Sequence, residues 1–323
     1  MPDPSDQGLR LGERAIALVF PGQGAQAVGM GRDLFQQFDA AREIFARADQ
    51  ALGFSLSRLC FEGPEDELTR TVNTQPAILT TSIAYLRVFE DVYGAPLHPR
   101  FVAGHSLGEY TALVAAGSLS FETAVRLVQE RGRLMQESGE RQPSGMAAVM
   151  GLDEESIHAA CVEVSRDGPQ MVVQIANLNG PGQIVISGTL DGLRAATDLL
   201  KSRGAKRVVP LKVSGAFHSP VMQPAADGLR EAVASVEVRA AQVPLIANAS
   251  ASPITDADGV RTELIEQLCA PVQWHRSVEC MVREGIETFV EFGPGQVLGG
   301  LIKRITKEAS VESISSLDAL VPR

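Results

Sequence analysis

The sequence predicts an α/β protein with a mainly parallel sheet and a smaller α+β domain inserted into it. Two observations carry this prediction. Buried strand patterns such as AIALVF (15–20) alternate with helical patterns along most of the 323 residues, which favours a parallel sheet with helices on both faces. Between residues 144 and 213 the pattern changes to β-α-β-β-α-β, which is the ferredoxin-like arrangement.

The large domain is expected to comprise residues 1–142 and 211–323. Its first strand ends at Pro21-Gly22, because this pair favours a turn. The patterns then predict helices, a short buried strand and a return to alternating strands and helices. The expected helices are 31–52, 75–93, 107–117, 121–137, 224–236 and 262–269, and the strands are 99–106, 243–248 and 287–295.

The inserted domain is expected to comprise residues 143–210. Two of its strands flank the turn Asn179-Gly180-Pro181-Gly182, and its first helix carries Ile157, Ala160 and Cys161 on one face. Its predicted strands are 145–152, 171–179, 182–188 and 205–213, and its helices are 154–164 and 190–204.

Composition excludes several classes of function. A net charge of −10 argues against a nucleic-acid-binding face. No apolar run approaches eighteen residues, so no membrane span is expected. The cysteines are scattered without C-x-x-C spacing, which favours free thiols in a cytoplasmic protein over disulfides or a metal site. An anionic substrate would need a local basic patch, for which the candidates are Lys201, Arg203, Lys206, Arg207, Lys303 and Arg304.

The most specific motif is Gly104-His105-Ser106-Leu107-Gly108, which has the form G-x-S-x-G. It lies between a short strand and a helix of small residues, the context of a nucleophilic serine in an α/β-hydrolase-like domain. The glycines remove side chains that would collide across a sharp turn. The backbone N–H of Leu107 then lies at a helix N-terminus, where it can donate to a developing oxyanion.

A serine nucleophile needs a base, and the chain has five histidines. His105 is expected to point to the opposite side of the turn. His218 follows the last strand of the inserted domain, at the junction where a cleft between domains would lie. His218 is therefore the candidate base, and the alternatives are His98, His158 and His275.

Other signals are weaker. Gly22-x-Gly24-x-x-Ala27 partly matches a dinucleotide-binding loop, but the following stretch predicts a helix instead of the acidic second strand. The residues alone leave Arg131 and Arg133 on a solvated helix face, and Gln23 as one of many possible anion-binding amides.

Eight segments together resemble the malonyl-coenzyme A:acyl carrier protein transacylase family and the related acyltransferase domains of polyketide synthases. They occur in that family's order, from residue 20 to residue 305, and any one of them is modestly specific. These segments are FPGQGAQ (20–26), NTQPAIL (73–79), GHSLGEYTALVAAG (104–117), QERGRLMQ (129–136), ANLNGPGQIVISG (176–188), GAFHSPVM (215–222), PVQW (271–274) and FGPGQVL (292–298).

The resemblance implies a role for each matching residue. Ser106 would carry the acyl group, with His218 as its general base, and the N–H groups of Gln23 and Leu107 would form the oxyanion hole. Arg131 would pair with the free carboxylate of a malonyl group, for which a planar guanidinium is suited. A backbone carbonyl would orient the histidine, and the matching position is Gln267. Phe217 resembles the malonyl-selective form of its motif, in which smaller residues tend to accept methylmalonyl groups.

The implied reaction is a ping-pong transfer of malonyl from coenzyme A to the phosphopantetheine thiol of an acyl carrier protein, for fatty acid or polyketide synthesis. It needs no metal or prosthetic group, and the protein is expected to act as a monomer. The competing predictions are an acyl hydrolase that uses the same serine, and a non-catalytic docking protein.

Overall fold

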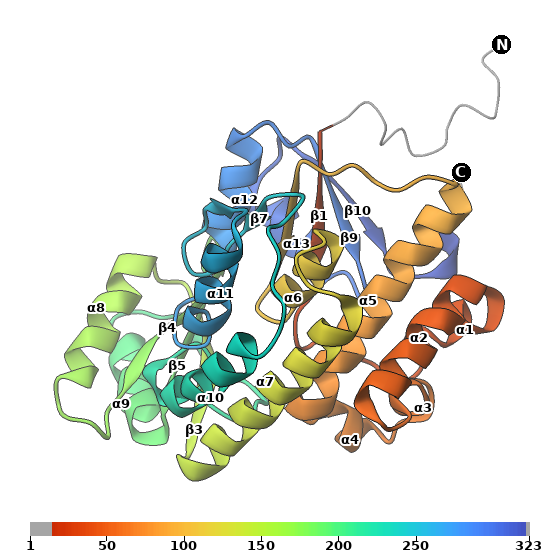
Figure 1. Cartoon of the computed structure of the whole chain (residues 1–323). Helices are drawn as coiled ribbons and strands as arrows, with labels where there is room; N and C mark the ends of the chain where they lie inside the picture. Colours follow the sequence, from red (N-terminus) through yellow and green to blue (C-terminus); the bar gives the residue numbers. More distant parts are fainter. Residues whose placement is uncertain (1–14, 321–323) are drawn as a thin grey trace.

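The computed structural model describes residues 15–320 (Figure 1), which form two sheets with helices packed around them. The larger sheet has the strand order β10-β9-β1-β2-β7-β8. All neighbouring strands in it are parallel except the last pair, β7 and β8. Its strands are β1 (Ile16–Phe20), β2 (Phe101–Gly104), β7 (Leu245–Ile246), β8 (Pro253–Ile254), β9 (Thr288–Phe292) and β10 (Ser310–Ile314).

Both faces of the inner strands β1, β2 and β9 are buried, which explains their nearly continuous apolar pattern, whereas the edge strand β10 is partly exposed. Side chains alternate between faces along a strand. On β1, Leu18 and Phe20 therefore join the core on one side, whereas Ala17 and Val19 join a second core on the other. Helices α5 (Thr71–Tyr93), α6 (Gly108–Ala115) and α7 (Phe121–Arg141) contribute to the first core, and α12 (Trp274–Arg283) and α13 (Val297–Ile305) to the second.

The smaller sheet has the order β4-β5-β3-β6 and is antiparallel throughout. Apolar side chains of α8 and α9 form a core with one of its faces. From the sheet, Met146, Ala176 and Val185 join the main core instead. The predicted fold class is therefore confirmed, while the exact domain boundaries at 143 and 210 stay a prediction. The elements are β3 (Ser144–Met150), α8 (Glu154–Ser165), β4 (Val173–Gly180), β5 (Gln183–Thr189), α9 (Leu190–Ser202) and β6 (Arg207–Pro210).

Several element boundaries differ from the prediction. The helix expected over 31–52 is two helices, because Phe38 adopts an extended conformation between them. Two short helices precede α5 and were not predicted. The strands expected at 205–213 and 243–248 shrink to four and two residues, since pairing ends there. The remaining helices are α1 (Arg32–Gln37), α2 (Asp39–Leu52), α3 (Leu56–Glu62), α4 (Glu65–Thr69), α10 (Gln223–Ala234) and α11 (Ala257–Glu266), and the 3₁₀ turns are η2 (Pro220–Met222) and η3 (Leu317–Ala319).

A search of residues 15–320 finds no helix with the length and apolarity needed to cross a membrane.

Candidate active site

The site lies where two central strands of the larger sheet end. Strands β1 and β2 are parallel neighbours, and Phe20 is in register with Gly104. Their carboxyl ends therefore meet at one edge, which is where open α/β sheets bind ligands. Because the loop with Gln23 follows β1 and Ser106 follows β2, both residues lie at this edge and line one cavity.

The turn that carries Ser106 is as sharp as the motif predicts. A Cβ on Gly104 would lie 1.9 Å from the carbonyl carbon of Gly108, and a Cβ on Gly108 would lie 2.0 Å from the carbonyl oxygen of Phe20. Ser106 itself has a φ of 52°, which costs about 1–3 kcal/mol for a residue with a side chain. Its N–H donates to Asn248 Oδ1 at 2.7 Å, and this bond fixes the strained residue.

His218 faces the serine hydroxyl directly. Its Nε2 lies 2.7 Å from Ser106 Oγ, and its Nδ1 lies 2.8 Å from the backbone carbonyl oxygen of Gln267. Since a carbonyl oxygen only accepts, Nδ1 must carry the proton and donate. Nε2 is then the acceptor for the hydroxyl of Ser106. The predicted partner positions 106, 218 and 267 are thus brought together.

The surroundings keep His218 neutral. Burial lowers its pKa to about 3, and the positive charge of Arg131 acts in the same direction. The side chain is only 3% exposed. At neutral pH the imidazole is therefore free to accept a proton.

Arg131 is buried, not solvated, and lies beside Ser106. The side chain is 1% exposed. Its Nη2 donates to Ser106 Oγ at 3.0 Å and to Gln267 Oε1 at 2.8 Å, and its Nη1 donates to Gln75 Oε1 at 2.9 Å. Burial lowers its pKa, but an arginine remains charged in proteins. A guanidinium held by neutral oxygens next to a hydroxyl is a site prepared for an anion.

The two predicted oxyanion donors also border the serine. Gln23 lines the cavity, and Leu107 follows Ser106 directly, at the start of α6. Within residues 15–320, neither backbone N–H donates to a protein acceptor. The side chain of Gln23 is held separately, since its Nε2 lies 3.4 Å from Thr71 Oγ1. Both amides can thus donate to a bound substrate.

The cavity in front of Ser106 encloses about 260 Å³ and lies between the two sheets. Strands β3, β4 and β5 of the smaller sheet line one side, and the turn after β2 and helix α13 line the other. Phe217 lines it as well and is 6% exposed. The cavity therefore matches the predicted cleft at the junction between the domains.

The expectation for His105 is wrong. This side chain lines the same cavity as Ser106, and its Nε2 lies 2.8 Å from Asn179 Oδ1 on β4. The hydrogen bond to Asn179 explains the difference, because it holds the imidazole toward the smaller sheet, and burial lowers the pKa of His105.

The expected basic patch is only partly placed near the cavity. Arg304 donates from Nη1 to Oε1 of Gln183, a cavity-lining residue, at 2.9 Å. Arg203 instead pairs with Glu163 on the surface of the smaller sheet's helices. The cation nearest to Ser106 is Arg131, which was not among the patch candidates.

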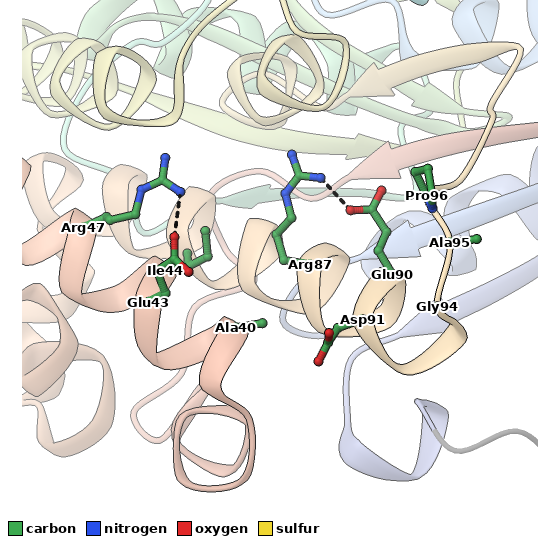
Figure 2. A pocket seen from close by; sticks show the side chains of 10 residues that line it. All are labelled: Ala40, Glu43, Ile44, Arg47, Arg87, Glu90, Asp91, Gly94, Ala95 and Pro96. Atoms are coloured by element: carbon green, nitrogen blue, oxygen red, sulfur yellow. Dashed lines mark hydrogen bonds and ion pairs between the residues drawn. The ribbon is translucent and has the colours of Figure 1, made fainter.

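A second hollow, of about 490 Å³, lies between α2 and α5 (Figure 2). Its arginines are engaged in ion pairs, Arg47 with Glu43 and Glu122, and Arg87 with Glu90. It contains no histidine, serine or cysteine among its lining residues. The chemistry is therefore assigned to the cavity at Ser106.

Three buried residues around the serine were missed by sequence reasoning, namely Gln75, Glu109 and Asn248. Asn248 could have been found, because it follows β7 at the same sheet edge as Ser106. Gln75 and Glu109 lie inside helical patterns, where nothing distinguishes them from surface residues.

Comparison with known proteins identifies the family of this chain. Residues 17–322 match the acyl transferase domain family. The chain is 47% identical to the malonyl CoA-acyl carrier protein transacylase of Bacillus subtilis (strain 168), over 94% of this chain and 95% of that protein. It is 44% identical to the protein of the same name from Escherichia coli (strain K12), over 94% and 97%.

Solved structures are similar over the same length. An acyl carrier protein S-malonyltransferase from Vibrio cholerae superposes with a TM-score of 0.90 at 42% identity, covering 94% of this chain and 98% of that one. A malonyl-transacylase solved in complex with a type II PKS acyl-carrier protein gives 0.89 at 41% identity, covering 95% and 97%. The chain therefore belongs to the acyl transferase domain family, alongside the malonyl CoA-acyl carrier protein transacylases.

Proposed function

We propose that this protein transfers a malonyl group from coenzyme A to the phosphopantetheine thiol of an acyl carrier protein, through an acyl ester on Ser106. The observation that carries the proposal is the buried guanidinium of Arg131, 3.0 Å from the serine hydroxyl. An acyl group that ends in a carboxylate is the substrate class that such a site favours. The names of the relatives point to the same donor and acceptor.

In the first half-reaction, Ser106 Oγ attacks the thioester carbon while its proton passes to His218 Nε2. The 2.7 Å separation of these atoms is within the range for direct proton transfer. The carbonyl oxygen becomes an oxyanion and accepts from the N–H groups of Gln23 and Leu107. The C–S bond then breaks, and the leaving sulfur takes the proton from His218, which yields coenzyme A and the acyl ester.

In the second half-reaction, His218 removes the proton of the carrier protein's thiol. The sulfur attacks the ester carbon, the same two N–H groups stabilise the oxyanion, and the C–O bond to Ser106 breaks. Ser106 Oγ recovers the proton from His218, so the enzyme returns to its starting state. Every proton is carried by the one imidazole, and the step requires no metal or prosthetic group.

Arg131 supplies the specificity for a dicarboxylic acyl group. Two parallel N–H donors match the two oxygens of a carboxylate. The guanidinium is already buried and held by hydrogen bonds in the free enzyme, so little further free energy is needed to order it when the substrate binds. Although the chain has a net charge of −10, this local cation favours an anionic acyl group.

A hydrolase would use the same serine and histidine with water as the acceptor. We favour transfer, because a hydrolase that clears acyl chains has no need of a carboxylate-binding guanidinium, and the relatives are named transacylases. The test is to incubate the protein with malonyl-CoA, with and without phosphopantetheinylated carrier protein. Malonylated carrier protein is expected by mass spectrometry, and rapid release of free malonate without that product would contradict the proposal.

We also propose that the protein acts as a monomer in the cytoplasm, in fatty acid or polyketide synthesis, and binds neither nucleic acid nor membranes. Its cysteines support a reducing compartment, since Cys60, Cys161, Cys269 and Cys280 are all free thiols.

The rate of acylation is expected to stay constant across the range where an ordinary histidine titrates. A folded pKa of His218 near 3 means that the base is deprotonated at any higher pH. We therefore expect kcat/KM for malonyl-CoA to be level between about pH 5 and 7.5, with any loss at lower pH. A stopped-flow profile checks this, and a tenfold decline centred near pH 6.5 would show that His218 titrates normally.

Replacing Phe217 with serine is expected to raise the use of methylmalonyl-CoA relative to malonyl-CoA. The ring lines the cavity within the segment that carries His218. Removing it makes room beside the acyl α-carbon, where one methyl group changes the specificity by about 1–3 kcal/mol, or roughly 10- to 200-fold. The measurement is the ratio of kcat/KM values for the two thioesters. An unchanged ratio would show that Phe217 does not set the selectivity.

A further inference from the structure

A buried carboxyl group lies close to Ser106 in the chain and takes no part in the two half-reactions. Glu109 is on the first turn of α6, three residues after Ser106, and is completely buried. A buried carboxyl group is costly unless its oxygens are satisfied by donors. Its hydrogen bonds therefore indicate what this side chain does.

Both oxygens of Glu109 accept from amide groups of two other residues. Oε1 accepts from the backbone N–H of Asn248 at 2.8 Å and from its Nδ2 at 3.0 Å. Oε2 accepts from Nε2 of Gln267. These two residues are themselves buried, at 1% and 0% exposure.

Asn248 holds the backbone of the nucleophile. Its Oδ1 accepts from the N–H of Ser106 at 2.7 Å, and its Nδ2 donates to the carbonyl oxygen of Gly104 at 2.7 Å. Reversing this amide would place a donor against the N–H of Ser106 and an acceptor against the carbonyl of Gly104. The orientation that Glu109 selects is thus the one that stabilises the φ of 52° at Ser106.

Gln267 links the nucleophile, the base and the cation. Its Nε2 donates to the carbonyl oxygen of Ser106 at 3.0 Å, and its Oε1 accepts from Arg131 Nη2 at 2.8 Å. Its backbone carbonyl oxygen accepts from His218 Nδ1. If the side-chain amide reversed, an NH₂ group would face the guanidinium, and Arg131 would lose an acceptor.

We propose that Glu109 is a positioning residue that fixes the orientation of both amides, and through Gln267 sets the preference for a carboxylate-bearing acyl group. This inference rests on the proposed function. A carboxyl group offers acceptor oxygens on both sides, whereas an amide of the same shape has an oxygen on one side and an NH₂ donor on the other. Glu109 thereby orients both Asn248, which holds Ser106, and Gln267, which holds Arg131.

The neighbouring Glu263 is compatible with this role. It is 6% exposed, and its Oε1 accepts from the N–H of Ala249 at 2.9 Å. Burial and the charge of Glu263 raise the pKa of Glu109. A carboxyl oxygen keeps a lone pair whether or not the group is protonated, so both oxygens of Glu109 can still accept from the amides.

The test is the variant Glu109→Gln. Its amide can keep Oε1 toward Asn248, which has two donors, but its NH₂ group then faces Nε2 of Gln267. Gln267 must reverse, so Arg131 loses an acceptor while the contact between Asn248 and Ser106 remains. We expect the ratio of kcat/KM for malonyl-CoA to that for acetyl-CoA to fall about tenfold. General damage to the fold would lower both values and leave their ratio unchanged.

Two further variants complete the experiment. Glu291→Gln is the matched control, because this buried glutamate also accepts on both oxygens, from the N–H groups of Leu298 and Gly299. It is expected to lower the melting temperature but not the ratio. Glu109→Asp keeps both acceptors and is expected to restore most of the ratio.

The outcomes separate this inference from the proposed function. If the unaltered protein forms no malonyl ester on Ser106, the proposed function fails. If it does form the ester, and folded Glu109→Gln keeps the original ratio, the positioning role of Glu109 is wrong. If Glu109→Gln does not fold, Gln267→Leu gives a second test, because it removes the acceptor for Arg131 directly. An unchanged ratio of kcat/KM for malonyl-CoA to that for acetyl-CoA in Gln267→Leu also overturns the inference.

Discussion

Replacing Ser106 with alanine is expected to abolish the covalent acyl-enzyme and to lower the rate of transfer by about 10⁴-fold or more. The reason is that, among the described residues, the hydroxyl of Ser106 is the one that faces His218 Nε2, at 2.7 Å, at the turn where the oxyanion donors converge. Intact-mass analysis after brief exposure to malonyl-CoA measures the adduct. The unaltered protein should gain the mass of one malonyl group, and Ser106→Ala should gain none.

His218→Ala is the companion variant for this prediction. It keeps the hydroxyl of Ser106 but removes the base that contacts it within residues 15–320, so the ester should still form on Ser106 but far more slowly. The two changes act on one proton transfer, and their effects are therefore not expected to add. An adduct of normal size and rate on Ser106→Ala would locate the nucleophile elsewhere.

Replacing Arg131 with alanine is expected to lower kcat/KM for malonyl-CoA by about 10²- to 10³-fold. The acetyl group of acetyl-CoA has no free carboxylate, so its kcat/KM should change much less, and the preference between the thioesters should largely disappear. For Arg131→Lys, kcat/KM for malonyl-CoA should lie between the values of the unaltered protein and Arg131→Ala, because an ammonium group keeps the charge but not the paired donors. The measurement is steady-state acylation with both thioesters.

Arg133→Ala is the matched control for the change at Arg131. It lies two residues further along α7, is exposed, and pairs with Glu130 and Glu137. Surface ion pairs of this kind contribute about 0–1 kcal/mol, so both activity and the preference should be preserved. An equal loss of malonyl and acetyl transfer in Arg131→Ala would instead assign a purely structural role to Arg131.

The residues alone predicted the parts of this protein that depend on local pattern. The strand-turn-helix around Ser106 follows from two glycines and a run of small residues, and the ferredoxin-like order follows from the spacing of apolar segments. These are contacts between residues close in sequence, where the local pattern and the fold agree. The bend at Phe38 and the early ends of β6 and β7 were not predicted, because tertiary packing and strand pairing end those elements.

The sequence by itself determined a serine on a sharp turn after a buried strand, in a chain that alternates strands and helices. The place of His218 after the last strand of the inserted domain made it the candidate base, but only the tertiary structure decided that His218 and Arg131 meet that serine, across 112 and 25 residues of chain. Periodicity placed Arg131 on a solvated helix face, but packing of α5 and α7 buried it against Gln75. Such pairings depend on long-range burial, which local pattern does not encode.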